Sequence, residues 1–167
     1  MIVHRSILAN LKELDQSYRK TTSPIESLFY SKLAILELCG WIEESMDDVI
    51  FRCARRHLKA SNNLVFVDKE IIKKTHGFDY ERNFRKMLMQ LLGLVNVERI
   101  EKDVDQNKRM QFTATLTALK LSRDSEAHTH IKGVTRRINA PSVTLSQFPT
   151  LYDGLVEYDK VLRNNNF

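Results

Sequence analysis

The longest regular pattern in the chain is SPIESLFYSKLAILELCGWIEESMDDVIFRCARRHL, residues 23–58. Residues on one side of this segment recur every three or four positions, as on one face of a helix; they are Ile25, Leu28, Lys32, Ile35, Cys39, Ile42, Met46, Val49 and Cys53. Ser23 can cap its start, Pro24 fits the first helical position, and Glu26 completes a capping-box spacing. The pattern predicts one helix from Pro24 to about Leu58.

The centre of this helix, from Leu33 to Ile42, is apolar on nearly all sides apart from Glu37. A helix of this kind is buried on several sides, inside a bundle or at a subunit interface. A thin bundle offers too little surface to cover it alone, and a two-fold contact is the commonest solution. We therefore expect a homodimer.

The rest of the chain also shows helical patterns. The expected helices are Ile2 to about Tyr18, Asp68–Thr75 closed by Gly77, a helix capped by Asp79 that ends at Gly93, about Asn107–Ile131 ending at Gly133, and roughly Gln147–Arg163 after a loop from Val134 to Ser146 that carries Pro141. Between Gly93 and Asp105 the pattern leaves open a short strand or an extended connection. Five or six helices, two of them long, predict an all-α bundle forming a single domain over residues 1–167.

Composition limits the possible classes. The 167 residues are 43% hydrophobic and 28% charged, which is typical of a globular domain, and only five Gly and three Pro argue against a sandwich or barrel. The net charge of +5 suits a polyanionic partner without requiring one. The sequence contains no glycine-rich nucleotide loop, its start lacks the long apolar run of a signal peptide, and no window approaches the length of a membrane span. Cys39 and Cys53 lie roughly 21 Å apart on one predicted helix, too far for a disulfide, so a reduced, cytoplasmic protein is expected.

A candidate site lies near the end of the predicted 107–131 helix, in Arg123-Asp124-Ser125-Glu126-Ala127-His128. Arginine offers a rigid fork of donors for a phosphate, and histidine exchanges protons near neutral pH. The apolar stripe of this helix, made by Phe112, Leu116 and Leu119, continues to Arg123. We therefore expect Arg123 at the rim of a packed interface.

His128 follows Arg123 at about 140° around an ideal helix and roughly 7.5 Å along it, so both reach one cleft only at a helix junction. Asp124 stands four residues before His128, a spacing that can orient the imidazole. Spacing alone also fits a solvated surface on which Arg123 pairs with Glu126 or Asp124. A second arginine–histidine pair of the same spacing, Arg52 and His57, ends the 23–58 helix, where cations favour the helix dipole.

The motif, followed by Thr129-His130-Ile131-Lys132-Gly133, resembles the R-x4-6-H signature of HEPN domains, in which an acidic or amide residue often follows the arginine and alanine often precedes the histidine. The segment from Ser31 to Glu44 is similar to an early long helix of the RiboL-PSP subgroup. The resemblance covers about residues 25–133. It implies a helical bundle that dimerises through its long helices, metal-independent RNA cleavage by Arg123 and His128 at a shared cleft, and settings such as toxin–antitoxin systems, phage defence or RNA processing.

In this interpretation no cofactor or metal is needed, and an antitoxin or other protein partner is possible. His128 and His130 lie about 200° apart on a helix and make a poor metal pair. The residues assigned around the pair are Asp124, Thr129 and Glu43 as auxiliary groups, and Lys132, Arg136 and Arg137 as contacts for flanking phosphates. Both assignments have plain alternatives: Glu43 also fits a solvated acidic face, and the basic residues also fit a loop without a partner.

Two other functions remain open from the sequence. Some HEPN domains have lost catalysis and only bind nucleotides or proteins. In addition, residues 68–93 read as helix, turn and helix with Lys73, Lys74, Arg82, Arg85 and Lys86 in an exposed pattern, as in a helix-turn-helix DNA-binding module. A helical hairpin packed on the bundle is the alternative, because the segment also supplies Phe78, Phe84, Met87, Leu88, Leu91 and Leu92 to a core.

Overall fold

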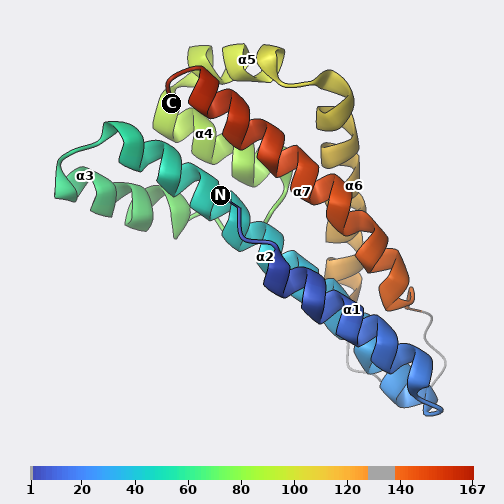
Figure 1. The fold of residues 1–167 in the computed structure, drawn as a ribbon. Helices are drawn as coiled ribbons and strands as arrows, with labels where there is room; N and C mark the ends of the chain where they lie inside the picture. Colours follow the sequence, from blue (N-terminus) through green and yellow to red (C-terminus); the bar gives the residue numbers. More distant parts are fainter. Residues whose placement is uncertain (1, 128–137) are drawn as a thin grey trace.

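The computed structural model describes residues 2–127 and 138–167, and over these ranges the chain is helical, without a strand (Figure 1). The α-helices are α1 (Arg5–Lys20), α2 (Pro24–His57), α3 (Ser61–Phe66), α4 (Arg85–Leu92), α5 (Leu94–Asp103), α6 (Gln106–Ala127) and α7 (Pro141–Asn164), and the π-helical segments are η1 (Val67–Ile72) and η2 (Tyr80–Phe84). The predicted all-α class is confirmed.

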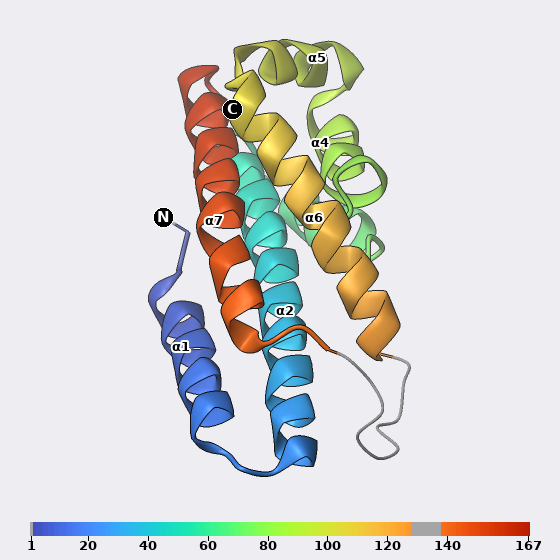
Figure 2. The ribbon, with the colours of Figure 1, turned by 90° about the vertical axis from the view of Figure 1, so that its right-hand side faces the viewer.

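Helix α2 is the central element of the bundle. It packs against α1, α6 and α7, and α6 in turn packs against α7 (Figure 2). α4 and α5 lie at the end of the bundle away from α1. The side chains that α2 buries completely are Ala34, Leu38, Ile42, Met46, Val49 and Ile50. They belong to one hydrophobic cluster that receives residues from every long helix, so α2 fixes the positions of its neighbours.

The start of α2 follows the sequence signal with one change. Ser23 Oγ accepts a hydrogen bond from Glu26 N at 3.3 Å, as a helix cap does. The reciprocal bond of a capping box is replaced, because the carboxylate of Glu26 accepts from the hydroxyl of Thr21. Thr21 Oγ1 then accepts from Ser23 N at 3.1 Å. Pro24 is the first helical residue, as expected.

The predicted burial of Leu33 to Ile42 is confirmed on one side only. Ala34, Ile35, Leu38, Cys39 and Ile42 are buried. Leu33 is 44% exposed. Toward the N-terminus of α2, Phe29 is 54% exposed and Ile25 is 47% exposed, so the three residues form a stripe of exposed apolar side chains. These three residues recur every four positions, so they form one uncovered face of α2 within the described chain.

The segment after Gly93 differs from both sequence expectations, because α5 is a helix rather than a strand or an extended connection. Gly93 has a positive φ of 79°, which lets the chain leave α4 and enter α5 without a loop. Val97, Ile100 and Val104 are buried at steps of three and four. This spacing is helical, and α5 raises the number of helices above the five or six expected.

Other helix boundaries also differ from those predicted from the sequence. α7 begins at Pro141, so residues 141–146 are helical rather than loop, because proline is favoured at the first helical position. The helix expected at Asp68–Thr75 begins at Ser61 and ends at Ile72. Asp79 caps η2 through a hydrogen bond from Arg82 N at 2.9 Å, and Gly77 has a φ of 105°, so the cap and the turn are confirmed.

Two further findings concern the chain as a whole. Cys39 and Cys53 are both buried, free thiols on α2, as predicted. Among the described helices, none combines the length and the apolar character that a membrane crossing requires.

Substitution of a glycine by alanine should have opposite effects on stability at Gly154, where α7 contacts α6, and at Gly40 in α2. A Cβ added to Gly154 in α7 would overlap the ring of Phe112 and lie 2.7 Å from its Cβ, whereas a Cβ on Gly40 in α2 meets nothing within 4 Å. We expect Gly154→Ala to lower the free energy of unfolding by about 1–3 kcal/mol. Gly40→Ala should raise it by about 1 kcal/mol through helix propensity. Urea unfolding of both variants measures this, and equal effects would contradict the close packing at Phe112.

Candidate functional site at the end of α6

Arg123 lies at the rim of the core, as its place in the sequence predicts. The preceding stripe residues Phe112, Leu116 and Leu119 are buried, and the Arg123 side chain is 32% exposed. Its guanidinium carbon stands 5.5 Å from the centre of the Phe78 ring, in the loop before η2. The ring therefore supports the guanidinium, and a held arginine loses less conformational freedom on binding an anion than a fully solvated one.

Asp124 is the charged neighbour of this arginine on α6. Its Oδ1 atom lies 3.0 Å from Arg123 Nε, and the Asp124 side chain is 49% exposed. The pairing of Arg123 with Asp124 that the sequence allowed is therefore present. Because both groups remain partly exposed, water screens the pair and it contributes little to folding.

Cys39 and Glu43 of α2 lie near the same end of α6. Burial raises the pKa of the Cys39 thiol to about 12; the Arg123 charge lowers it, and Glu43 and Asp124 raise it. All three charged groups therefore act on one buried thiol. Because that thiol is protonated at neutral pH, Cys39 has the character of a core residue rather than a nucleophile.

Glu43, the expected auxiliary acid, fastens the loop that carries Phe78. Its Oε1 atom accepts a hydrogen bond from Gly77 N at 2.5 Å. The contact joins the middle of α2 to the residue next to Phe78, so Glu43 positions the ring beneath Arg123. Glu43, Arg123 and Asp124 thus come together at one end of α6, while the solvated acidic face that was the alternative does not describe Glu43.

The acidic cluster around Glu43 divides into residues with different surroundings. Asp48 pairs with Arg52, and Glu44 is exposed. Asp47 is half-buried, and its pKa is raised to about 7, first by burial and then by the charges of Glu43, Glu44 and Asp68. A carboxyl group that titrates near neutral pH can carry a proton, which is a property of functional sites. No group of metal-binding side chains occurs among the residues that the structure describes.

The remaining residues of the expected site fall in residues 128–137, outside the described ranges. These are His128, Thr129, Lys132, Arg136 and Arg137. The structure therefore places Arg123, Asp124 and Glu43 but not the histidine of the motif.

The second arginine–histidine pair has structural partners. Arg52 pairs with Asp48, and its Nη2 atom lies 3.4 Å from Asp159 Oδ1 on α7. Asp159 is 4% exposed and also pairs with Arg163 Nη2 at 3.1 Å. His57 is exposed in the last turn of α2. Arg52 thus ties α2 to α7, and His57 adds a side chain at the end where cations favour the helix dipole.

The helix-turn-helix segment is packed as a hairpin. Phe78, Phe84, Met87 and Leu88 are buried in the core, and Leu91 and Leu92 are half-buried. Most of its basic side chains already have acidic partners within the segment or the bundle: Lys73 pairs with Asp68, Lys74 with Glu70, and Arg85 with Glu81 and Glu101. Of the cations expected to face DNA, Arg82 and Lys86 remain exposed without an ion pair to another described residue.

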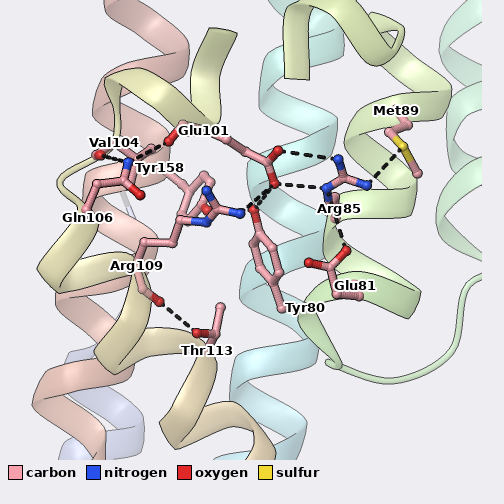
Figure 3. Close-up of polar contacts among 10 residues, drawn as sticks. All are labelled: Tyr80, Glu81, Arg85, Met89, Glu101, Val104, Gln106, Arg109, Thr113 and Tyr158. Carbon is pink, nitrogen blue, oxygen red and sulfur yellow. Dashed lines mark hydrogen bonds and ion pairs between the residues drawn. The ribbon is translucent and has the colours of Figure 1, made fainter. Parts of the chain in front are cut away.

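A second polar cluster lies near the other end of α6, around Glu101 of α5 (Figure 3). Glu101 is 7% exposed, and its Oε1 atom accepts hydrogen bonds from Arg85 Nε at 2.9 Å, Arg109 Nη2 at 3.2 Å and the Tyr80 hydroxyl at 2.6 Å. The Tyr158 hydroxyl donates to that of Tyr80 at 2.7 Å. The Glu101 carboxylate thus connects η2, α4, α5 and α6 directly, and Tyr80 extends the cluster to Tyr158 of α7.

The charges in this Glu101 cluster change its acidity. Burial alone would raise the pKa of Glu101, but the bonds from Arg85 and Tyr80 and the charge of Arg109 outweigh it and lower the pKa. Burial also raises the pKa of Tyr80, so its hydroxyl stays protonated and donates. The sequence did not predict this cluster, because Arg85 was considered only within the helix-turn-helix alternative and Glu101 lay in a segment not recognised as helix.

No known family model matches the chain, and neither the curated proteins nor the solved structures contain a significant match.

Proposed function

We propose that the protein is a metal-independent endoribonuclease of the HEPN type that acts as a homodimer. The observation that supports this most is the position of Arg123, whose guanidinium rests over Phe78 at 5.5 Å with its side chain 32% exposed. His128 follows it at the spacing of the motif. An arginine held in this way presents a planar fork of donors to a phosphate.

The proposed reaction uses the RNA 2′-hydroxyl as nucleophile. His128 removes its proton, the 2′ oxygen attacks the adjacent phosphorus, and the bond to the 5′ oxygen breaks as that oxygen takes a proton from the protonated His128. Arg123 stabilises the negative charge that builds on the phosphate oxygens. The products are a 2′,3′-cyclic phosphate and a 5′-hydroxyl, and no metal enters the reaction.

Other residues assist in this proposal. Asp124, 3.0 Å from Arg123 Nε, sets the orientation of the guanidinium, and Glu43 holds the loop under it through Gly77. Thr129 is an auxiliary group, and Lys132, Arg136 and Arg137 would bind phosphates on either side of the scissile bond.

The exposed face of α2 supports the dimer. Ile25, Phe29 and Leu33 are 47%, 54% and 44% exposed on one side of the helix. A contiguous apolar stripe on a surface is a common site of association, and a second copy is the simplest partner for it. In this proposal the cleft is shared between copies. A molar mass equal to that of a single chain, measured by light scattering at micromolar concentration, would contradict the shared cleft.

A catalytically silent nucleotide- or protein-binding module is the second candidate. The contact of Asp124 with Arg123 favours it, because that contact gives the arginine a partner without RNA. Such a module would bind RNA or a protein partner and leave RNA intact.

The deciding experiment is cleavage of an end-labelled oligoribonucleotide by the purified protein in EDTA. We expect cuts in single-stranded RNA with 2′,3′-cyclic phosphate ends. The matched control is the same sequence with 2′-O-methyl groups, which has no nucleophile and should remain whole. Intact RNA, cleavage that EDTA abolishes, or cleavage of the methylated strand would each contradict the proposal.

A further inference from the structure

We propose that a pocket beside the Glu101 cluster binds a ribose phosphate, either as a free sugar phosphate or as one nucleotide of an RNA chain. The pocket has a volume of about 520 Å³ and lies between η2 and the first half of α6. This volume is within the range of small-molecule sites. The lining residues that determine its chemistry are Arg82, Gln106, Arg109, Thr113 and Thr117.

Two arginines give the pocket cationic donors. Arg109 Nη2 donates to Glu101 at 3.2 Å, and its guanidinium carbon lies 5.6 Å from the centre of the Tyr80 ring. A guanidinium has five N–H donors, so this one contact leaves others for a ligand. Arg82 is exposed at the pocket and acts on Asp79 through its charge, without a close ion pair among the described residues. Arg109 is therefore positioned by the protein, while Arg82 can adjust to the ligand.

The neutral polar groups of the pocket act as acceptors. The Thr113 hydroxyl donates to Arg109 O at 2.9 Å, and the Thr117 hydroxyl donates to Thr113 O at 3.0 Å. Gln106 Nε2 donates to the carbonyls of Glu101 and Val104, both at 2.8 Å. The two threonine hydroxyls and the Gln106 amide nitrogen thus donate their hydrogen bonds to backbone carbonyls. The hydroxyl oxygens and the Gln106 amide oxygen can still accept hydrogen bonds from a ligand.

The charge around the pocket favours an anion. Its carboxylates have cationic neighbours: Asp79 Oδ2 lies 2.9 Å from Lys120 Nζ, and Glu81 lies 3.6 Å from Arg85 Nε. The charged groups in and directly behind the pocket are the cations Arg82, Arg85, Arg109 and Lys120 and the anions Asp79, Glu81 and Glu101. The charges that line the pocket itself cancel, Arg82 and Arg109 against Asp79 and Glu81, and the surplus of one positive charge comes from Arg85 and Lys120 against Glu101 behind it.

The two kinds of group together specify the ligand. Cationic donors suit a phosphate, and acceptors with committed protons suit ligand hydroxyls, so the ligand carries both. A ribose phosphate is the smallest common unit with this combination. Arg109 and Arg123 stand about 21 Å apart along α6, so the pocket is separate from the Arg123 site. Binding at this pocket does not require the protein to cut RNA.

Calorimetric titration with ribose 5-phosphate, ribose and inorganic phosphate tests this. We expect ribose 5-phosphate to bind at least about tenfold more tightly than either fragment. Arg82→Gln should weaken its binding roughly tenfold or more, the loss expected for a charged hydrogen bond. The double variant Thr113→Val, Thr117→Val should reduce the affinity for ribose 5-phosphate to that for phosphate. Lys86→Gln, which removes an exposed cation of α4 outside the pocket, is the matched control and should bind normally.

A competing oligoribonucleotide, titrated with His128→Ala protein to avoid cleavage, separates the two sources. Displacement of ribose 5-phosphate supports a nucleotide of an RNA chain, and binding of the sugar phosphate alone supports a free metabolite. Equal affinities for phosphate and ribose 5-phosphate would overturn the proposal. So would unchanged binding by a folded Arg82→Gln protein. None of these readings depends on RNA cleavage, so sugar-phosphate binding and ribonuclease activity are tested separately.

Discussion

His128→Ala is expected to reduce the rate of RNA cleavage about 10²–10⁴-fold, the loss typical of removing a general acid or base. The folded state should be unaffected, which circular dichroism and thermal unfolding can verify. The assay is single-turnover cleavage of the labelled oligoribonucleotide in EDTA. Full activity in the folded variant would mean that another residue moves the proton, and Asp47 would then be the first to test, because its pKa is raised to about 7.

Arg123→Ala should cause a comparable loss through transition-state charge stabilisation. Arg123→Lys should recover little of it, because a point charge does not replace the planar fork. The matched control is His57→Ala, which removes the exposed histidine of the second pair. Arg52 is unsuitable as a control, because it pairs with the buried Asp159. If His57→Ala loses activity and His128→Ala keeps it, the wrong pair has been assigned.

The fold was predictable where local chemistry marks an element. Ser23 and Pro24 fixed the start of α2, and Asp79 fixed the start of η2. α5 was not predicted, because Gly93 was taken only as the end of the helix before it. The positive φ of Gly93 also allows α4 and α5 to meet without a loop. Pro141 was read as a loop residue, although a proline also fits the first turn of a helix.

The candidate site was predictable only along α6. The position of Arg123 at the core rim follows from the spacing of the stripe before it. The ring of Phe78 beneath Arg123 and the bond from Gly77 to Glu43 join residues far apart in the sequence. The raised pKa of Asp47 likewise depends on Asp68, which the fold of η1 brings near. Contacts of this kind are set by tertiary packing, which the periodicity of a single segment does not contain.

Glu101→Gln is expected to lower the free energy of unfolding by about 2–3 kcal/mol at neutral pH. Removing one partner of a buried ion pair costs about 3–5 kcal/mol, because the other charge is left uncompensated. Here the side chains of Arg85 and Arg109 are 24% and 28% exposed, so water offsets part of the loss. Tyr80 keeps an acceptor in the glutamine oxygen. Urea unfolding at neutral pH measures the difference.

The pH dependence of this difference identifies its cause. The pKa of Glu101 is lowered in the folded protein, so its charge stabilises the fold fully above the unfolded-state value of about 4.3, and this contribution disappears as the pH falls through the lowered folded value. The gap between wild type and Glu101→Gln should therefore be largest near neutral pH and shrink in acid. Glu98→Gln, on the same helix and exposed, is the control and should have little effect at either pH. A gap that stays constant into acid would show that lost packing, rather than lost charge, destabilises the variant.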